Sequence, residues 1–322
     1  MQKLVINGGK KLSGEVTIGG AKNSTVALIP AAILSDTPVV LDSVPQIRDV
    51  KNLRSILKDM NVTSEMNNDV LRIDPTKIQF AELPSGKVSS LRASYYFMGA
   101  MLGRFGKAVV GFPGGDDIGP RPIDQHIKGF EALGATVTNE KNKYIVEAEE
   151  LNGANIYLDF PSVGATQNIM MAATLAKGTT IIENVAREPE IVDLANVLNK
   201  MGAKVYGAGT EKIKIIGVES LHGTEHAIIQ DRIEAGTFMV ASALTQGNVL
   251  IKEAIAEHNI PLISKLEEMG VKVIEENEGI RIIGPEKLKP TTVKTLPHPG
   301  FPTDMQPQIS ILQLAAEGTS IL

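Results

Sequence analysis

The sequence predicts a mixed α/β protein built from a repeated unit of about 70 residues, and two recurring patterns support this prediction. In the first pattern, an apolar helical run ends in a small turn, and a strand rich in β-branched residues follows. In the second, an amphipathic helix ends in Gly or Asn and leads into another strand. Because the patterns alternate along the chain, one unit consists of a helix, a strand, a second helix and a strand pair.

The first pattern recurs in segments such as "AILSDTPVVL", "ATLAKGTTII" and "LAAEGTSIL". Each segment has the apolar periodicity of a buried helix before the turn and strand-forming residues after it. The turns lie near Asp36, Gly106, Gly178, Gly247 and Gly318. The even spacing of these turns predicts one buried helix followed by one strand in every unit.

The second pattern keeps the same phase, in segments such as "FEALGATVT" and "LEEMGVKVI". Its turns lie at Asn61, Gly134, Gly202 and Gly270. The markers outline four complete units and a fifth that stops soon after its first helix. Because an open unit would leave strand edges and an apolar helix face uncovered, we expect the chain to be a truncated form of a longer protein, with its last units missing.

Composition excludes several classes of function. Of the 322 residues, 43% are hydrophobic and 21% are charged, and no apolar run is long enough to span a bilayer, so we expect no membrane partner. The N-terminal residues lack the apolar core of a secretory signal, which predicts a cytoplasmic protein. No cysteine is present, which excludes disulfides and thiolate metal sites. The net charge of −5 argues against a nucleic-acid partner.

Positive side chains recur beside the predicted helix starts. Lys22, Arg92 and Arg232 each stand at the beginning of a unit's first helix, within segments rich in capping residues. A cation is slightly unfavourable there, because the helix dipole and the first backbone amides favour an anion. The repetition therefore indicates an anionic ligand, and Arg121, in the Gly- and Pro-rich loop 112–126, would add another cation.

Other motifs carry weaker signals. The segment "GGAKNST" lacks the spacing of a nucleotide-binding P-loop. His222 and His226 stand four residues apart, but Gly223 places them in a connection between elements, and no third ligand indicates zinc, so we expect no metal. His126 is either a helix-start contact or a surface residue. Methionines such as Met170, Met171 and Met239 are expected to fill the core.

Seven segments taken in order resemble the UDP-N-acetylglucosamine 1-carboxyvinyltransferase family of enolpyruvyl transferases. They are "GGAKN", "LRAS", "GGDDIGPRPID", "SVGAT", "AREPEIVD", "DRIEAGT" and "HPGFPTDMQ", which together run along the whole chain. The resemblance implies two domains that form an inside-out α/β barrel of βαβαββ units. One domain would hold residues 22–229, with loop 112–126 over the cleft, and the other would combine residues 1–21 with 230–322.

The resemblance also implies a set of site residues. Lys22, Arg92 and Arg121 would bind the phosphate and carboxylate of phosphoenolpyruvate, while Asn23 would contact the reacting sugar. The remaining substrate-binding residues would be Arg121, Pro122, Ile123, Asp124 and Gln125 at the uracil and ribose, and Ser162, Val163 and Gly164 at the diphosphate. Asp304 matches the expected base for the sugar 3-hydroxyl. With Asp116, which stands at the position of the family's usual cysteine, the catalytic set would be Lys22, Asp116 and Asp304.

The implied reaction is an addition followed by an elimination, which needs a positioned acid and base and cations for the departing phosphate. No cofactor or metal is implied. The partners would be phosphoenolpyruvate and UDP-N-acetylglucosamine, with the protein a monomer. The implied role is peptidoglycan synthesis, and through cell wall biogenesis it would extend to cell shape, cell division and the cell cycle.

This sequence departs from the family pattern at two places. Asp116 stands where the family usually has a cysteine, so we expect resistance to fosfomycin, which alkylates that thiol. The absent tail would supply a further arginine for phosphoenolpyruvate and an acid near the sugar, so we expect this chain to turn over poorly, as a comparison of phosphate release with a longer form would test.

Two alternatives remain open at this point. A shikimate-type enolpyruvyl transferase would share the fold and the donor, although the segments "RPID" and "SVGAT" argue against it. A non-catalytic paralogue that binds sugar nucleotide would have little need to keep Lys22, Asn23, Arg121 and Asp304 together. Competition between acceptors and substitution of Lys22 or Asp304 would distinguish these alternatives.

Overall fold

The computed structural model describes residues 3–83, 92–112, 123–140 and 142–322, with the side chains of residues 92 and 93 left out. Its contacts divide the chain into two compact units. Unit 1 comprises Met1–Gly19 and Gln230–Leu322, and unit 2 comprises Gly20–Ile229. Each unit has its own hydrophobic core.

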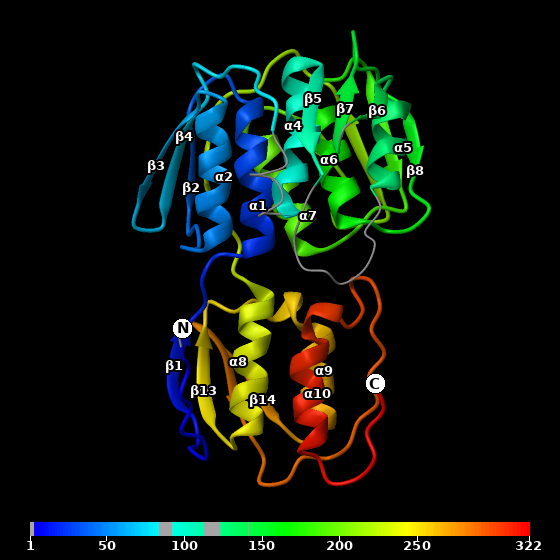
Figure 1. Ribbon diagram of the computed structural model, residues 1–322. Helices are drawn as coiled ribbons and strands as arrows, with labels where there is room; N and C mark the ends of the chain where they lie inside the picture. Colours follow the sequence, from blue (N-terminus) through cyan, green and yellow to red (C-terminus); the bar gives the residue numbers. More distant parts are fainter. Residues whose placement is uncertain (1–2, 84–91, 113–122, 141) are drawn as a thin grey trace. The chain divides into compact units, whose positions relative to one another are not determined.

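The described residues of unit 2 form three sheets of similar design (Figure 1). In two of them the orders are β12-β2-β4-β3 and β8-β9-β11-β10. The outer strand β12 or β8, here called the entry strand, pairs in parallel with its neighbour, and the other three strands pair in antiparallel fashion. The strands are β2 (Val39–Asp42), β3 (Thr63–Asn67), β4 (Val70–Asp74) and β12 (Glu225–Ala227), then β8 (Asn155–Tyr157), β9 (Thr179–Glu183), β10 (Lys204–Tyr206) and β11 (Lys212–Ile216).

The remaining sheet of unit 2 has the order β5-β7-β6. Its strands are β5 (Lys107–Gly111), β6 (Thr136–Glu140) and β7 (Lys143–Glu147). A parallel bridge between Leu83 and Val110 takes the place that the entry strand has in the other two sheets. The same unit therefore occurs three times, as the spacing of the turns predicts.

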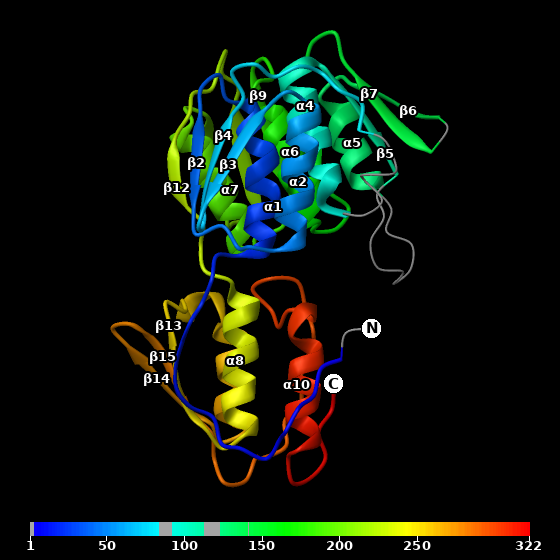
Figure 2. The same ribbon diagram turned by 60° about the vertical axis from the view of Figure 1, so that its left-hand side comes forward.

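The α-helices described in unit 2 follow two sequence types. The buried helices are α1 (Lys22–Ala31), α4 (Tyr96–Phe105) and α6 (Val163–Ala173); the amphipathic helices are α2 (Arg48–Asp59), α5 (Asp124–Ala132) and α7 (Pro189–Lys200). The first type is rich in small and apolar residues on every face, which a helix needs when neighbours surround it. Gly99 of α4 shows how closely they pack, because a Cβ there would lie 2.2 Å from the carbonyl oxygen of Asn168 in α6. Figure 2 shows α1 and α6 inside unit 2 with strands at its periphery.

Unit 1 repeats the design with one sheet, in the order β1-β13-β15-β14. Its elements are β1 (Ser13–Thr17), β13 (Asn248–Lys252), β14 (Lys272–Glu276), β15 (Gly279–Ile283), α8 (Arg232–Leu244), α9 (Ile260–Glu268) and α10 (Gln306–Leu314). Short 3-10 helices are η1 (Ala32–Leu34), η2 (Arg92–Tyr95), η3 (Ala256–His258) and η4 (Thr303–Met305). Thr292, before α10, and Ile321, after it, form a parallel bridge. This bridge corresponds to the pairing, in the other repeats, of an entry strand with the strand that follows the first helix.

The turn residues confirm the predicted repeat. Asn61, Gly134, Gly202 and Gly270 all have left-handed backbone, with φ of 58°, 97°, 101° and 90°. Each ends an amphipathic helix just before a strand, where Gly and Asn adopt this conformation at the least cost. The mixed α/β class is also confirmed, but the barrel expected from the resemblance is not seen as a closed sheet. The described strands form four separate sheets.

Candidate functional site

Several helices of unit 2 begin close together, as the surroundings of Gly164 show. A Cβ on Gly164, in the first turn of α6, would lie 2.7 Å from Tyr95 Oη and 3.0 Å from His126 Nε2. These neighbours come from η2, just before α4, and from the first turn of α5. The starts of α4, α5 and α6 therefore share one end of unit 2 (Figure 1). Their first backbone amides have no acceptor within the helix, and such ends attract anions.

Lys22 and Asn23 are exposed first-turn residues of α1. The N-cap residue, Ala21, offers no side-chain acceptor to the helix. Lys22 Nζ lies 3.1 Å from Asp49 Oδ2 of α2, with 57% of the lysine side chain still accessible. A cation at this end opposes the helix dipole, and the nearby carboxylate offsets part of that cost. An anionic ligand would compete with Asp49 for the same ammonium group.

Ser162 is the N-cap of α6 and its Oγ accepts a hydrogen bond from the Ala165 amide at 3.3 Å. Val163 and Gly164 follow as the first two residues of the helix, so their amides are among those that the helix leaves without an acceptor. Any side chain larger than that of Gly164 would meet Tyr95 and His126. The prediction that His126 is a helix-start contact or a surface residue resolves to the first, because the residue is only 5% exposed and its ring packs edge-on against that of Tyr95, with 5.1 Å between the ring centroids.

Ile123, Asp124 and Gln125 begin α5 in three different environments. The side chain of Ile123 is 8% exposed and belongs to the core, so any contact with a ligand would fall to its backbone. Asp124 is exposed. Gln125 is 3% exposed, and its amide hydrogen bonds all go to carboxylates or backbone nearby: Nε2 donates to Asp159 Oδ2 at 2.9 Å and Oε1 accepts from the Asp159 amide at 2.8 Å.

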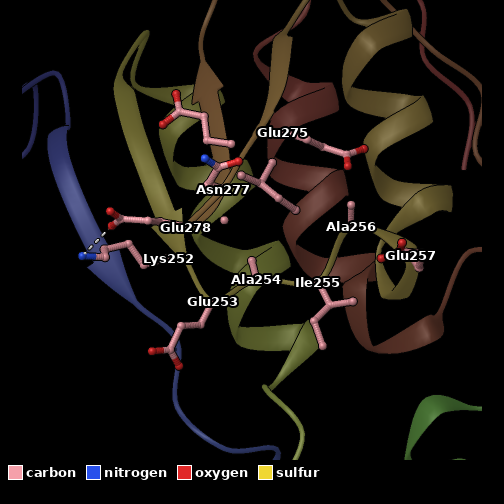
Figure 3. Close-up of a pocket in the computed structure, with 12 residues that line it drawn as sticks. Lys252, Glu253, Ala254, Ile255, Ala256, Glu257, Glu275, Asn277 and Glu278 are labelled. Atoms are coloured by element: carbon pink, nitrogen blue, oxygen red, sulfur yellow. Dashed lines mark ion pairs between the residues drawn. The ribbon is translucent and has the colours of Figure 1, made fainter.

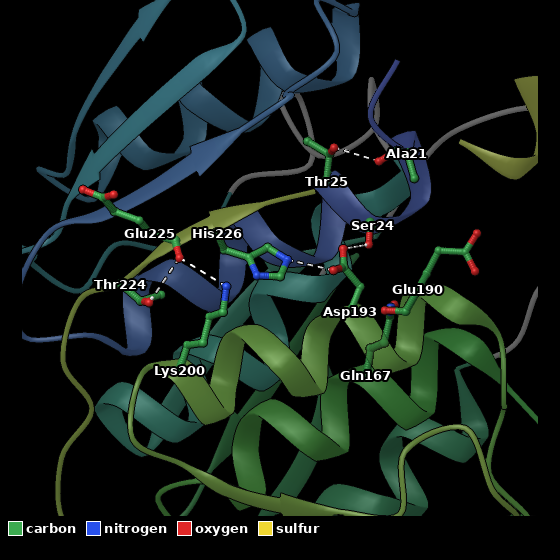
Figure 4. A network of polar contacts seen from close by, with 10 residues as sticks. All are labelled: Ala21, Ser24, Thr25, Gln167, Glu190, Asp193, Lys200, Thr224, Glu225 and His226. Atoms are coloured by element: carbon green, nitrogen blue, oxygen red, sulfur yellow. Dashed lines mark hydrogen bonds and ion pairs between the residues drawn. The ribbon is translucent and has the colours of Figure 1, made fainter. Parts of the chain in front are cut away.

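A buried polar network lies behind the start of α1 (Figure 4). Asp193 of α7 accepts hydrogen bonds from Ser24 Oγ and from His226 Nε2, the second at 2.7 Å. The prediction that His226 lies in a connection is wrong. Residues 225–227 form β12, which pairs in parallel with residues 40–42 of β2. Such a long-range pairing leaves little local signal in a strand of three residues.

The other predicted residues fall in two groups. In unit 1, Asp304 is exposed on η4 and Arg232 begins α8 with 8% of its surface accessible. Asp116, Arg121 and Pro122, and the side chain of Arg92, lie outside the described residues. The predicted core methionines Met170, Met171 and Met239 are fully buried.

A cavity of about 540 Å³ in unit 1 contains none of the predicted site residues (Figure 3). Its lining includes Glu253, Glu257, Glu275, Glu276 and Glu278, with Lys252 paired to Glu278 at 2.9 Å. This excess of carboxylates would repel the phosphate and carboxylate groups that the resemblance implies. The helix starts of unit 2 are therefore the better candidate for an anion site.

Two further properties follow from the described part of the chain. Within it, no group of three or more acidic, His or Cys side chains is arranged to hold a metal ion. None of the helices described there combines the length and apolarity that crossing a bilayer requires.

Sequence reasoning missed Asp159, Asp193 and Ser24 as parts of this region. Asp159 stands three residues before Ser162, and Ser24 directly follows Asn23, so both lie beside motifs that the sequence singles out. Asp193 lies within the segment "AREPEIVD". An acidic residue at a buried position of an amphipathic helix was the available signal, since such carboxylates need partners.

Residues 6–322 match the family model of EPSP synthase (3-phosphoshikimate 1-carboxyvinyltransferase). The chain is 60% identical to UDP-N-acetylglucosamine 1-carboxyvinyltransferase 2 of Latilactobacillus sakei and 58% identical to the protein of the same name from Lactiplantibacillus plantarum. Both alignments cover 100% of this chain, and they cover 77% and 76% of those two proteins.

Solved structures show the same fold at lower identity. The enolpyruvyl transferase NikO from Streptomyces tendae superposes with a TM-score of 0.85 at 24% identity, covering 98% of this chain and 75% of that one. EPSP synthase from Acinetobacter baumannii superposes with a TM-score of 0.74 at 21% identity, covering 98% and 74%. At such identities the likeness concerns the fold alone.

Proposed function

Since this chain belongs to the EPSP synthase (3-phosphoshikimate 1-carboxyvinyltransferase) family, we propose that it transfers the enolpyruvyl group of phosphoenolpyruvate to the 3-hydroxyl of UDP-N-acetylglucosamine and releases phosphate. The observation that carries this choice of acceptor is the 58–60% identity, over the whole chain, to two proteins named for that reaction. The family description names a different acceptor, so it supports the donor and the reaction type rather than the sugar nucleotide.

The helix starts of unit 2 supply the physical basis for binding the donor. Phosphoenolpyruvate carries a phosphate and a carboxylate, and each needs positive groups when it leaves water. In the proposal, Lys22, Arg92 and Arg121 contact these two groups. The partly exposed side chain of Lys22 at the start of α1 supports its part, because the amides and dipole of the helix add to the same attraction.

The acceptor would lie along the starts of α5 and α6. The first-turn amides at Val163 and Gly164 suit a diphosphate, for the same reason that helix N-termini suit other anions. Arg121, Pro122 and Asp124 would line the nucleoside, with Ile123 contributing backbone atoms. Gln125 would act indirectly, because its amide is bonded to Asp159. Ser162 caps the helix that presents the two amides.

The reaction proceeds by addition and then elimination. The 3-hydroxyl oxygen forms a bond to C2 of phosphoenolpyruvate, C3 accepts a proton, and the hydroxyl proton leaves to a base. The tetrahedral product then loses a proton from C3 and expels phosphate as the C2–C3 double bond returns. We assign Asp304 as the base for the hydroxyl and Asn23 to the tetrahedral centre. Cations near the leaving phosphate stabilise the charge that develops on it.

Asp116 stands at the position of the family's usual cysteine, and we assign it to proton transfer or product release. This residue lies outside the described part of the chain, so its assignment rests on the sequence. A carboxylic acid can exchange protons near neutral pH when its surroundings raise its pKa, but it cannot form a thioether. Resistance to fosfomycin, action in the cytoplasm and a part in cell wall growth belong to this same proposal.

A single-turnover assay tests the choice of acceptor. The 322-residue chain, in molar excess, is mixed with phosphoenolpyruvate and either UDP-N-acetylglucosamine or 3-phosphoshikimate, and inorganic phosphate is measured over time. We expect release with the sugar nucleotide and much less from Lys22→Ala. Release with 3-phosphoshikimate alone would assign the chain to the shikimate reaction. Binding of the sugar nucleotide without release would favour the non-catalytic alternative.

A further inference from the structure

The carboxylate of Asp193 is buried and joins three segments of unit 2. Asp193 is 1% exposed and lies on α7. One of its oxygens accepts a hydrogen bond from Ser24 Oγ of α1, and the other accepts from His226 Nε2 of β12. The three residues come from the first turn of one repeat's buried helix, an amphipathic helix of another repeat and the strand that returns to the first sheet (Figure 4).

The returning segment also contacts the start of α1 through its backbone. The Ala21 amide donates to the Ile229 carbonyl at 2.7 Å, three residues beyond His226. Thr25 Oγ1 donates to the Ala21 carbonyl at 2.7 Å. Because Ala21 provides no side-chain cap, these bonds and the Asp193 network contribute to fixing the first turn of α1.

The buried network and the exposed site residues are adjacent in the chain. Ser24 is fully buried, while its neighbours Lys22 and Asn23 face solvent on the same helical turn. A rotation or fraying of this turn would therefore move both exposed side chains. A buried carboxylate holds its partners firmly, because hydrogen bonds to a charged acceptor are stronger than neutral ones and an unpaired charge is costly to bury.

We propose that Asp193 is a positioning residue: with Ser24 and His226 as its donors, it holds the first turn of α1 so that Lys22 and Asn23 face the substrates. The effect on the substrates rests on the proposed function, whereas the effect on the first turn of α1 does not. It also assigns the protonated ring nitrogen of His226 to Nε2, since Nδ1 is buried with no hydrogen-bond partner among the described residues.

Ser24→Ala and Ser242→Ala form a matched pair of variants. Both serines are fully buried on the first helix of a repeat, but Ser242 Oγ donates to the Ile282 carbonyl in unit 1. Each variant loses one buried hydroxyl, so a general effect on stability would appear in both. Only Ser24→Ala is expected to raise the phosphoenolpyruvate concentration for half-maximal single-turnover phosphate release, by about fivefold or more, as the loss of a charge-assisted hydrogen bond allows.

A second pair tests the histidine. His226→Gln keeps an amide donor that can reach Asp193, whereas His226→Leu keeps bulk and removes the donor. We expect the phosphoenolpyruvate concentration for half-maximal phosphate release to stay close to the wild-type value in His226→Gln and to rise in His226→Leu. Equal losses in the two variants would contradict a role for the hydrogen bond.

Hydrogen exchange without substrate separates this inference from the proposed function. Amides of residues 24–29 and 31 of α1 are expected to exchange faster in Ser24→Ala than in the wild type and Ser242→Ala, Pro30 having no amide hydrogen. Unchanged exchange in Ser24→Ala would overturn the positioning role, whatever the activity. If no form of the chain released phosphate, the proposed function would fail, and the exchange result alone would decide whether Asp193 fixes the helix start.

Discussion

Gln125 and Asp159 hold each other by two hydrogen bonds, one from the glutamine amide to the carboxylate at 2.9 Å and one from the Asp159 backbone amide to the glutamine oxygen at 2.8 Å. Gln125 lies in the first turn of α5 and Asp159 lies just before α6. The pair therefore joins the two helix starts assigned to the sugar nucleotide. Lys128, one turn further along α5, adds an ion pair to the same carboxylate at 2.6 Å.

Gln125→Glu tests the importance of this pair. The change replaces an amide donor by a carboxylate beside Asp159 and Asp124, so the variant loses a hydrogen bond and gains repulsion. We expect the free energy of unfolding to fall by about 1–3 kcal/mol, measured as a lower urea midpoint. The matched control is Gln46→Glu, at an exposed position whose amide donates to the Asn68 carbonyl. It should change stability by less than about 0.5 kcal/mol, and equal effects would contradict this account.

The ionisation of Asp159 gives a prediction about pH. The Lys128 ammonium, and next the Gln125 amide, hold the pKa of the Asp159 carboxyl below its ordinary value of 3.8. Because the folded pKa is the lower one, the stabilisation is complete above pH values near 3.8 and is lost as the pH falls through the folded value.

Lys128→Met should therefore raise the pKa of Asp159 toward its ordinary value, as an NMR titration of the carboxyl carbon would measure. Lys177→Met is the control, since Lys177 pairs with Glu150 and is not among the groups that shift the pKa of Asp159. An Asp159 pKa that stays the same in both variants would show that the ion pair does not set it.

Asp49→Asn tests the competition for Lys22. The variant removes a carboxylate that lies 3.1 Å from the Lys22 ammonium, while the rest of α2 can stay as it is. Exposed ion pairs contribute about 0.2–1 kcal/mol, so phosphoenolpyruvate should half-saturate at a concentration about 1.4- to fivefold lower. Asp36→Asn, which removes the ion pair with Arg104 instead, should leave that concentration unchanged. Weaker binding in Asp49→Asn would contradict competition.

Asp116→Cys tests the assignment of residue 116. The wild type has no cysteine, so fosfomycin should leave its mass unchanged. In the variant the new thiol would be the only one, and we expect one covalent adduct when UDP-N-acetylglucosamine is present, as intact-mass spectrometry would detect. Absence of an adduct in the variant would remove the basis for equating residue 116 with the reactive position of the family.

The repeat could be predicted from the sequence because its signals are local. A Gly or Asn at the end of an amphipathic helix, such as Asn61 or Gly202, indicates a left-handed residue and a following strand without knowledge of the rest of the chain. The same holds for the burial of Met170 and Met239, which follows from apolar helical faces.

The connections between distant segments could not be predicted in this way. Ser24 and Asp193 are 169 positions apart, and Asp193 and His226 are 33 apart. No periodicity links such residues, and β12 is a strand only because β2 lies beside it. The environment of Gln125 could not be predicted for a different reason. Its motif indicates a ligand contact, but in the fold its side-chain amide donates to Asp159.

Calorimetric titration of the 322-residue chain with UDP-N-acetylglucosamine tests the central claim most directly, since the sugar nucleotide is what distinguishes the proposed reaction from the shikimate reaction. We predict saturable binding at one site per chain, with weaker binding by Gln125→Glu and no comparable binding of 3-phosphoshikimate. An absence of binding by the sugar nucleotide, or saturable binding of 3-phosphoshikimate in its place, would contradict the account.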